Sequence, residues 1–507
     1  MPARDRGRNA NRRPPQRRPT PPRRTPDPAR RVAFDLLAAI RERGAYANLT
    51  LPGLLDQAGL DERDAALATE LGYGTVRWQG TLDAILARCV DRPPADLDPP
   101  VLDVLRLGAY QILHTRIPAY AAVAATVNLA GSVVGEGPAR LVNAVLRKVN
   151  KRGLDAWIAE LAPPGSPDGI GEGTEPNLAE LALRHAHPEW IVRALADALG
   201  PDVAELGEAL AANNERPIVH LVARRVARDE LVSQVSGEPG PWSRYAVRIP
   251  SGGSPHSFAE IRDGRAGVQD EGSQLMALAL ARAPLDDLAP IAGAAQPDDA
   301  AQPEDAAQPE DAAQPEDAVP TTWWLDLCAG PGGKAALLAV LAPGSVRILA
   351  ADRAPHRAHL VAQATSGQQV TVLCADGLVA PWREGFADRV LVDAPCSGLG
   401  ALRRRPDARW RRSQQDVTDL AELQRGLLSA AVTAARSGGV VGYVTCSPHP
   451  AETVEIVEWT LSRGGVTLLD ARAALPDMPS LGAGPFVQLW PHRHGTDAMF
   501  LALLRVD

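Results

Sequence analysis

The chain has 507 residues, of which 45% are apolar and 22% charged, and this length is enough for about three globular domains. Five cysteines are too few for a disulfide framework, and no apolar run follows the N-terminal arginines, which argues against a secretory signal. Residues 117–135 form the longest uncharged stretch, but Pro118, Asn128 and Ser132 interrupt it, so no membrane span is predicted. We therefore expect a cytoplasmic protein with reduced thiols.

The net charge of −8 conceals two segregated segments. Residues 1–31 hold eleven arginines against two aspartates and lack apolar periodicity, which predicts a disordered tail. This tail is either a solubilising segment or an arm that tethers RNA, because polycations bind phosphate backbones without specificity. Residues 294–317 are four tandem hexapeptides, one AAQPDD and three AAQPED, with eight acidic residues and no basic one. They predict a disordered acidic insertion over residues 294–319.

Residues 32–160 have the apolar spacing of helices, beginning with Val32, Leu36, Leu37 and Ile40 on one helix face. Alternation typical of strands is rare here, so the segment is predicted to be an all-α bundle. Basic residues gather near its end and form either a solvated helix face or a surface that faces RNA. These residues are Arg140, Arg147, Lys148, Lys151 and Arg152.

A linker rich in proline and glycine, over residues 161–176, follows the bundle. Residues 177–213 again have helical spacing, and the segments 218–223 and 245–249 then resemble strands. We expect a small α+β module over residues 177–262.

The spacing changes after Pro320, where short apolar runs alternate with helical stretches. Buried parallel strands read as continuous apolar runs, so residues 263–507 are predicted to form a doubly wound, Rossmann-like α/β domain. The last run is expected to make the edge hairpin of the sheet. The predicted strands are residues 323–328, 346–351, 370–374, 389–392, 440–444 and 499–504.

The first of these strands runs into a glycine-rich turn, DLCAGPGGK, from Asp326 to Lys334. Such a turn between a strand and a helix lets the backbone approach a ligand closely. It is not a phosphate-binding P-loop, because Ala335 follows Lys334 where that loop needs a hydroxyl residue. Its glycines are also too tightly spaced for the pattern Gly-x-Gly-x-x-Gly.

The next three strands each end at an aspartate, namely Asp352, Asp376 and Asp393. Asp352 stands twenty-two residues beyond Gly330, where an acidic residue commonly binds ribose hydroxyls. Three acids at the ligand-binding edge of the sheet, without a phosphate loop, favour S-adenosylmethionine over NAD or ATP as the cofactor.

Two cysteines stand in polar turns directly after predicted strands, Cys396 beyond Asp393 and Cys446 beyond Thr445. No two cysteines have the spacing of zinc ligands, so no metal site is predicted. Carbon 5 of cytosine is a poor nucleophile until a thiolate adds to carbon 6, and the reaction then needs an acid near ring nitrogen 3 and a base for the carbon-5 proton. Two cysteines and one aspartate at neighbouring strand ends meet these needs. The other cysteines are expected to pack as small apolar side chains and are Cys89, Cys328 and Cys374.

Three segments, DLCAGPGGK, VLVDAPCSGLGALRRRPDARW and VTCSPHPAE, resemble motifs of the NOL1/NOP2/Sun family of RNA cytosine-5 methyltransferases. GVQDEGSQL (residues 267–275) and LWPHRHGTDAMF (residues 489–500) resemble its flanking signatures, and the bundle, with ARLVNAVLRK, resembles the RNA-binding domain of the antitermination factor NusB. The combination resembles the bacterial small-subunit ribosomal RNA methyltransferases. The chain departs from the family at Glu452-Thr453-Val454, where Glu-Asn-Glu is frequent, and at residues 497–500, DAMF, where Gly-Phe is usual.

The resemblance implies a role for each motif residue. Cys446 would be the nucleophile, Cys396 would assist product release, and Asp393 would lie beside the methyl donor and the cytosine ring. Asp352 would hold the ribose of S-adenosylmethionine and Asp376 its adenine end. The methionine part of the cofactor would be wrapped by Cys328, Ala329, Gly330, Pro331, Gly332, Gly333 and Lys334. A run interleaved with Trp410 would meet RNA phosphates, or else be a solvated charge run, and consists of Arg403, Arg404, Arg405, Arg409, Arg411 and Arg412.

We therefore predict a multi-domain methyltransferase with an N-terminal all-α NusB-like bundle, a small α+β module and a C-terminal α/β Rossmann-like domain that binds S-adenosylmethionine. Its expected substrate is a cytosine of 16S ribosomal RNA, free or in an assembling small subunit. The protein is expected to be a monomer without a membrane or metal partner. The alternatives are a non-catalytic NusB-like RNA-binding or antitermination factor, and a methyltransferase for protein or small molecules, which would not need two cysteines.

Overall fold

The computed structural model describes residues 26–162, 177–250, 255–285 and 322–507. Most of the expected tail, most of the expected linker and the whole acidic repeat lie outside the described residues. The described chain forms two compact units. The first contains the described part of Met1–Ala45, with Thr50–Thr75 and Leu82–Leu154, and the second contains Tyr46–Leu49, Val76–Thr81 and the described part of Asp155–Asp507. The finer boundaries at residues 160, 176 and 262 remain a proposal.

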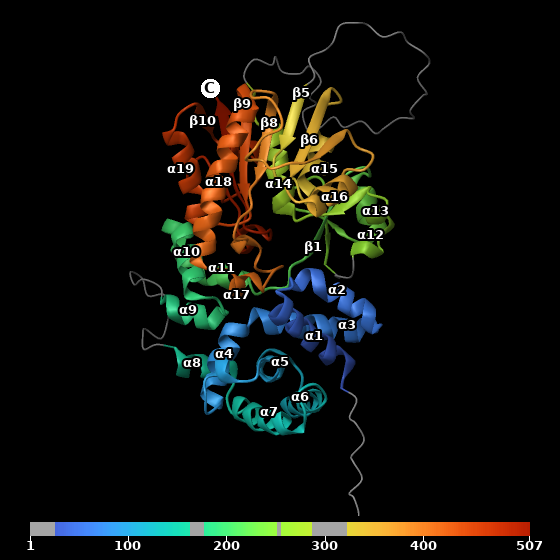
Figure 1. Cartoon of the computed structure of the whole chain (residues 1–507), viewed down its shortest axis with the longest axis vertical. Coiled ribbons are helices and arrows are strands. Elements are labelled where there is room, and N and C mark those ends of the chain that lie inside the picture. The colour runs from blue at the N-terminus through green and yellow to red at the C-terminus, as the bar shows by residue number, and fades with distance from the viewer. Residues whose placement is uncertain (1–25, 163–176, 251–254, 286–321) are drawn as a thin grey trace, which may run out of the picture. The chain divides into compact units, whose positions relative to one another are not determined.

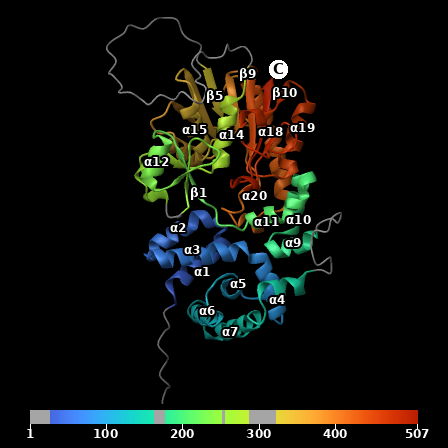
Figure 2. The same cartoon turned by 180° about the vertical axis from the view of Figure 1, so that it is seen from behind.

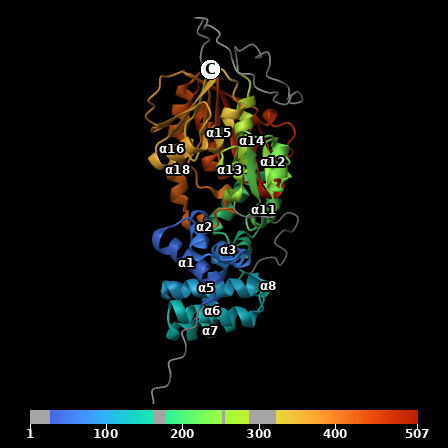
Figure 3. The ribbon, with the colours of Figure 1, turned by 90° about the vertical axis from the view of Figure 1, so that its right-hand side faces the viewer.

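The first unit is all-helical, as predicted. Its apolar helix faces pack together, so that Leu36, Leu82, Leu105 and Leu129 are fully buried. Helices α5, α6 and α7 lie side by side in Figure 3 and contact one another. Its helices are α1 (Pro28–Arg43), α2 (Ala47–Ala58), α3 (Glu62–Arg77), α4 (Gln79–Cys89), α5 (Pro99–His114), α6 (Ala119–Val133) and α7 (Glu136–Val149), of which α2, α3 and α4 each give a few terminal residues to the second unit.

Helix α1 corrects the predicted end of the N-terminal tail. The tail was expected to reach residue 31, but α1 begins at Pro28. The Asp27 side chain accepts a hydrogen bond from the Arg30 backbone N–H, and proline at the first helical position suits a helix start. The cap therefore begins the helix before the first apolar residue of the pattern.

The second unit contains a small sheet, which agrees with the predicted strands near residues 218–223 and 245–249. Its four strands are antiparallel and have the order β2-β3-β1-β4. The strands are β1 (Val219–Ala223), β2 (Glu238–Pro239), β3 (Ala246–Ile249) and β4 (Ala266–Val268). The helices before and beside this sheet are α8 (Leu154–Leu161), α9 (Leu178–His185), α10 (Glu189–Leu199), α11 (Leu206–Ala212), α12 (Arg228–Val235) and α13 (Ala259–Arg262).

The second unit also contains an eight-stranded sheet, the Rossmann-like sheet that the apolar runs predicted. Its order is β10-β12-β9-β8-β5-β6-β7, with β11 paired to β12, and β5 to β9 are parallel. The strands are β5 (Thr322–Asp326), β6 (Val346–Asp352), β7 (Val370–Cys374), β8 (Ala387–Asp393), β9 (Ala435–Thr445), β10 (Val466–Leu469), β11 (Val487–Gln488) and β12 (Phe500–Val506).

Helices cover both faces of this sheet, which Figures 1 and 2 show from opposite sides. Alternate strand residues pack on opposite faces, with Leu391 in the core beneath α14 and α15 and its neighbour Val390 in the core beneath α18 and α19. The helices are α14 (Glu271–Arg282), α15 (Gly333–Leu341), α16 (Pro355–Ala364), α17 (Ala408–Arg411), α18 (Gln414–Ala434), α19 (Val454–Ser462) and α20 (Pro491–His494). The 3₁₀ turns are η1 (Pro94–Asp96), η2 (Gly200–Glu205), η3 (Pro255–Ser257), η4 (Leu399–Ala401), η5 (Pro450–Glu452) and η6 (Ala471–Ala474).

The edge of the sheet differs from the prediction. The last strand, β12, was expected to make an edge hairpin. It does pair antiparallel with the edge strand β10, but residues 470–499 separate the two strands, so they form no tight hairpin, and β12 itself lies between β9 and β10. Residues Phe500 to Leu504 are buried on both faces, which is the environment of an interior strand. The edge strand β10 has only four residues, one of them the exposed Thr467, so its pattern is weak in the sequence.

The sheet changes its winding direction at β5. From β5 the chain passes to β6 and β7 on one side, whereas β8 pairs with β5 on the other side. In doubly wound sheets, ligands bind beyond the carboxyl ends of the strands at such a switch point. The loops after β5 and β8 are therefore where a site is expected. No described helix is long and apolar enough to cross a membrane.

Candidate active site

The two cysteines predicted for catalysis meet at this edge. Strands β8 and β9 are parallel neighbours in which Asp393 pairs with Val444, so the loops that carry Cys396 and Cys446 leave the sheet together. The two Sγ atoms are 3.3 Å apart, and both side chains are half-buried. The juxtaposition follows from the strand order, because parallel neighbours end at the same edge.

The two thiols differ in acidity. The hydrogen bond from the Cys396 thiol lowers the pKa of Cys446, against the effects of burial and of the Asp393 carboxylate, and the positive charges of Arg405 and Lys334 act in the same direction as the hydrogen bond. The same contact, together with burial, raises the pKa of Cys396 well above its ordinary value. Cys446 is therefore the more acidic of the two thiols, and Cys396 is the hydrogen-bond donor when Cys446 ionises.

Replacing Cys396 with alanine should raise the pKa of the Cys446 thiol, because it removes the hydrogen-bond donor that stabilises the thiolate. The pH dependence of Cys446 alkylation by iodoacetamide, followed on the Cys446 peptide by mass spectrometry, should then shift to higher pH than in the wild type. Cys396→Ser keeps a donor and should shift less. Identical profiles for all three proteins would contradict the assignment.

A buried ion pair adjoins the two sulfurs. Lys334 lies in the first turn of α15 with 8% of its surface exposed, and its Nζ is 2.8 Å from Asp393 Oδ2. Burial alone lowers the pKa of Lys334, but Asp393 outweighs burial and raises it, so the ammonium stays charged. A cation at a helix N-terminus opposes the helix dipole, and Asp393 compensates for this. Lys334 thus stands beside Cys446 as well as in the predicted cofactor turn.

The residue that closes β5, Asp326, was not among the predicted site residues. Its side chain is fully buried. Among the described residues, no donor makes a hydrogen bond of normal geometry to either carboxylate oxygen. Burial, with the nearby Asp393 carboxylate, raises its pKa to about 8. The signal that singled out Asp352, Asp376 and Asp393, an aspartate at a strand end, applies to Asp326 as well and would have found it.

Asp352 organises the glycine-rich turn. Its carboxylate accepts hydrogen bonds from the backbone N–H groups of Gly330 at 3.1 Å and Ala354 at 2.9 Å, and it pairs with Arg357 Nε at 3.2 Å. Arg357 also donates to the Gly330 carbonyl. A Cβ at position 330 would overlap the Asp352 carboxylate, so this close approach requires glycine. Gly332 has a φ of 106°, which also favours glycine.

The other predicted positions at this edge have mixed outcomes. Asp376 lies just beyond β7, half-buried, where it accepts a hydrogen bond from the Leu378 N–H at 3.0 Å. Cys374 was expected to be buried but is exposed, because β7 is the edge strand of the sheet. Cys89 is buried as expected. The Cys328 thiol packs against the core, and burial raises its pKa, which makes it unreactive.

The structure corrects part of the prediction that the arginine run meets RNA phosphates. Half of the run turns inward: Arg403 and Arg404 pair with Asp497, and Arg404 also pairs with Asp270 at 2.6 Å. Asp497 belongs to the unusual closing motif, so that motif anchors the run. Arg409 is fully buried among backbone carbonyls. Those three therefore stabilise the fold rather than contact RNA, because their guanidinium groups are already bound to carboxylates or carbonyls of the protein. Arg405 and Arg411 are exposed and Arg412 is half-exposed, as is Arg404 despite its two carboxylate partners.

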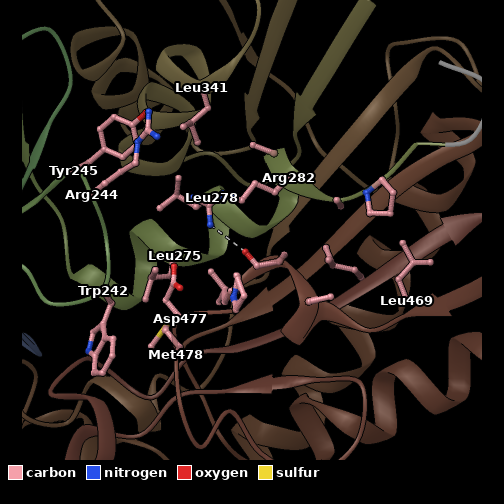
Figure 4. A pocket seen from close by; sticks show the side chains of 18 of the residues that line it. Trp242, Arg244, Tyr245, Leu275, Leu278, Arg282, Leu341, Leu469, Asp477 and Met478 are labelled. Carbon is pink, nitrogen blue, oxygen red and sulfur yellow. Dashed lines mark hydrogen bonds between the residues drawn. The ribbon is translucent and has the colours of Figure 1, made fainter. Parts of the chain in front are cut away.

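A cavity of about 1130 Å³ lies elsewhere on the same unit, at the C-terminal end of α14 (Figure 4). Trp242, Leu278 and Met478 are among its lining residues, and no candidate site residue lines it. Within the described ranges, no group of three or more His, Cys, Asp or Glu side chains could hold a metal ion.

Comparisons with known proteins identify the family of this chain. The sequence profile described as 16S rRNA methyltransferase RsmB/F matches residues 314–505, and the NusB family profile matches residues 27–151. A ribosomal RNA small subunit methyltransferase B of Pseudomonas putida is 31% identical, over 84% of this chain and 87% of its own length. The chain belongs to the RsmB/F family of methyltransferases.

Other relatives extend the likeness over nearly the whole chain. A putative methyltransferase of Mycobacterium tuberculosis is 51% identical over 94% of this chain and 96% of its own length. A probable ribosomal RNA small subunit methyltransferase B of Bacillus subtilis is 28% identical over 94% of this chain and 98% of its own. The crystal structure of PH0851 has the same fold, with a TM-score of 0.72, 20% identity, and coverage of 95% of this chain and 99% of that one.

Proposed function

We propose that this protein transfers a methyl group from S-adenosylmethionine to carbon 5 of a cytosine in 16S ribosomal RNA, through a covalent adduct with Cys446. The observation that supports the reaction type is the pair of sulfurs 3.3 Å apart, beside the Lys334–Asp393 ion pair. Methyl transfer to oxygen, or to most nitrogens, needs no thiol nucleophile, so this pair favours a carbon acceptor. The substrate class follows the names of the relatives from Pseudomonas putida and Bacillus subtilis.

The cysteines and the ion pair divide the chemistry of addition. The Cys446 thiolate forms a bond to carbon 6 of the ring, and the displaced π electrons make carbon 5 nucleophilic. Negative charge then develops toward ring nitrogen 3, where the Lys334–Asp393 pair can place a positive charge or a hydrogen bond. The target base must leave its stack to reach sulfurs in this loop pocket.

Cys396 serves the elimination that follows. While Cys446 is a thiolate, its charge and hydrogen bond keep Cys396 protonated. Once Cys446 is bound to carbon 6, its sulfur no longer carries the negative charge that raised the pKa of Cys396. The Cys396 thiol then becomes easier to ionise. Cys396 can then help to remove the carbon-5 proton, after which the carbon–sulfur bond breaks and Cys446 leaves as a thiolate.

The residues at the strand ends fit S-adenosylmethionine, which when bound supplies an electrophilic methyl group. The cofactor presents an amino group and two ribose hydroxyls as hydrogen-bond donors. The buried oxygens of Asp326 have no hydrogen-bond partner in the described chain and can accept from these groups. Asp352, at the position predicted for the ribose, is a second acceptor. Gly330 lets the turn approach Asp352 so closely that a Cβ at this position would overlap the carboxylate, so the turn depends on a glycine here. We assign Asp376, just beyond β7, to the adenine end of the cofactor.

The proposal predicts transfer of a labelled methyl group from S-adenosylmethionine to 16S ribosomal RNA, tested both as free RNA and as small-subunit particles. Nuclease digestion of the product should yield label only in 5-methylcytidine. Cys396→Ala, which retains the nucleophile, should accumulate a protein–RNA adduct that survives a denaturing gel. Label in another nucleoside, or RNA binding without any transfer, would contradict the proposal, and the second result would favour a non-catalytic NusB-like factor.

A further inference from the structure

A buried carboxylate connects the two cysteine loops. Glu452 ends η5 and has no exposed surface. Each cysteine is followed by a serine, Ser397 after Cys396 and Ser447 after Cys446, and both serine side chains are buried. The two loops thus present the same kind of donor, at the same offset from the sulfur, toward one acceptor.

Both serines donate to the same oxygen of Glu452. The distances to Glu452 Oε2 are 2.5 Å from Ser397 Oγ and 2.6 Å from Ser447 Oγ. Glu452 Oε1 accepts from the Ser397 backbone N–H at 2.7 Å and from Gln424 Nε2 at 3.2 Å. We call these four residues the Glu452 cluster. Hydrogen bonds to a carboxylate are among the stronger ones, so this set restrains both loops.

The cluster is anchored on regular structure rather than on the loops. The Tyr443 hydroxyl, on β9, donates to the Glu452 backbone carbonyl at 2.8 Å. Gln424, on α18, also donates to the Pro395 carbonyl, next to Cys396, at 2.8 Å. The carboxylate is therefore held by the sheet and by a 21-residue helix, and it can impose a position on each loop.

Glu452 itself is not placed to react. A carboxylate offers about four acceptor positions, and four protein donors occupy them here. The carboxylate thus has no open position for substrate or for the cysteine sulfurs. Its negative charge does act on Cys396, whose thiol it helps to keep protonated.

We propose that Glu452 is a positioning residue that sets the separation of the Cys396 and Cys446 sulfurs by holding Ser397 and Ser447 on one carboxylate oxygen. A hydrogen bond between thiols weakens steeply with distance, so a small displacement of either loop would release it. The catalytic consequence rests on the proposed function, whereas the effect on the distance between the sulfurs does not.

The test is Glu452→Gln, which keeps the shape but puts an amide NH₂ where one acceptor oxygen stood. Since an NH₂ group cannot accept the two serine hydrogens, the loops should separate. We expect kcat for RNA methylation to fall about 100-fold, with KM for RNA nearly unchanged, as is typical of a small misplacement of reacting groups. The matched control is Glu455→Gln, the same change at an exposed glutamate of α19 outside the cluster, which should behave as wild type.

A second readout needs neither RNA nor cofactor. The diazene oxidant diamide joins two neighbouring thiols: their two hydrogens pass to the diazene, which becomes a hydrazine, and one sulfur–sulfur bond forms. Wild-type protein should form the Cys396–Cys446 disulfide rapidly, and Glu452→Gln at least ten times more slowly. Crosslinking of Glu452→Gln at the wild-type rate would overturn the proposal.

The serines provide a double-mutant cycle. Ser397→Ala/Ser447→Ala should slow crosslinking about as much as Glu452→Gln, and the triple variant should be no slower than either, because all three remove the same link. If Glu452→Gln does not fold, the serine double variant, with the carboxylate intact, carries the test, and wild-type crosslinking in it would refute the link. If wild-type protein crosslinks rapidly but methylates no RNA, the proposed function fails while the positioning role stands.

Discussion

Replacing Cys446 with alanine is expected to abolish methyl transfer to RNA, with a rate loss of more than about 10³-fold, because no other group can form the bond to carbon 6. Cys396 cannot substitute, because its sulfur is displaced by 3.3 Å from that of Cys446, and burial and the Glu452 charge still raise its pKa when Cys446 is absent. The variant should bind S-adenosylmethionine as well as the wild type does, because Cys446 belongs to the loop after β9 and the cofactor turn follows β5.

Single-turnover transfer of a labelled methyl group measures the first effect, and calorimetric titration with S-adenosylhomocysteine measures the second. Cys374→Ala is the matched control, because it removes an exposed thiol at the opposite edge of the sheet, with three strands between it and β9. Turnover of the Cys446 variant within a few-fold of wild type would refute the covalent role. Loss of cofactor binding would instead show that the change disturbs the whole site.

Replacing Arg409 with methionine is expected to lower the free energy of unfolding by about 3 kcal/mol or more, because buried acceptors would lose their donor. The Arg409 guanidinium is fully buried and donates to the carbonyls of Ala186 at 3.0 Å and Asn213 at 3.2 Å, and to Asn214 Oδ1 at 2.9 Å. Methionine fills part of the space but satisfies none of these oxygens. These contacts connect α17 to the ends of α9 and α11, so their loss weakens the packing of the segment after the Cys396 loop.

Urea unfolding followed by circular dichroism measures this loss. Arg405→Met is the control, since Arg405 lies in the same run and is exposed, so its replacement should change the free energy of unfolding by less than about 0.5 kcal/mol. The experiment also separates the buried role from the RNA contact expected for the run. If Arg409 met a phosphate, the variant would keep its stability and show weaker, less salt-dependent RNA binding.

The arginine run shows why composition alone misleads. The arginines between residues 403 and 412 are identical in the sequence but have different surroundings in the structure. Arg404 binds two carboxylates, Arg409 binds backbone carbonyls, and Arg405 remains exposed. Those partners come from Asp270 and from helices far away in the chain. A run of charged residues therefore forms an exposed binding surface only where no other part of the chain packs against it. The residue types within the run do not show whether this is so.

The apolar runs were enough to predict the alternation of strands and helices. They also predicted that Cys396, Cys446 and Asp393 meet, because all three follow strands and neighbouring parallel strands end at one edge. The folded chain alone shows which thiol is the more acidic, that Asp326 is buried and which groups Glu452 contacts. These properties depend on distances of a few ångströms between side chains from separate elements. Hydrogen bonds and charge interactions in a buried site change steeply over such distances, whereas apolar periodicity records only which face of an element is covered.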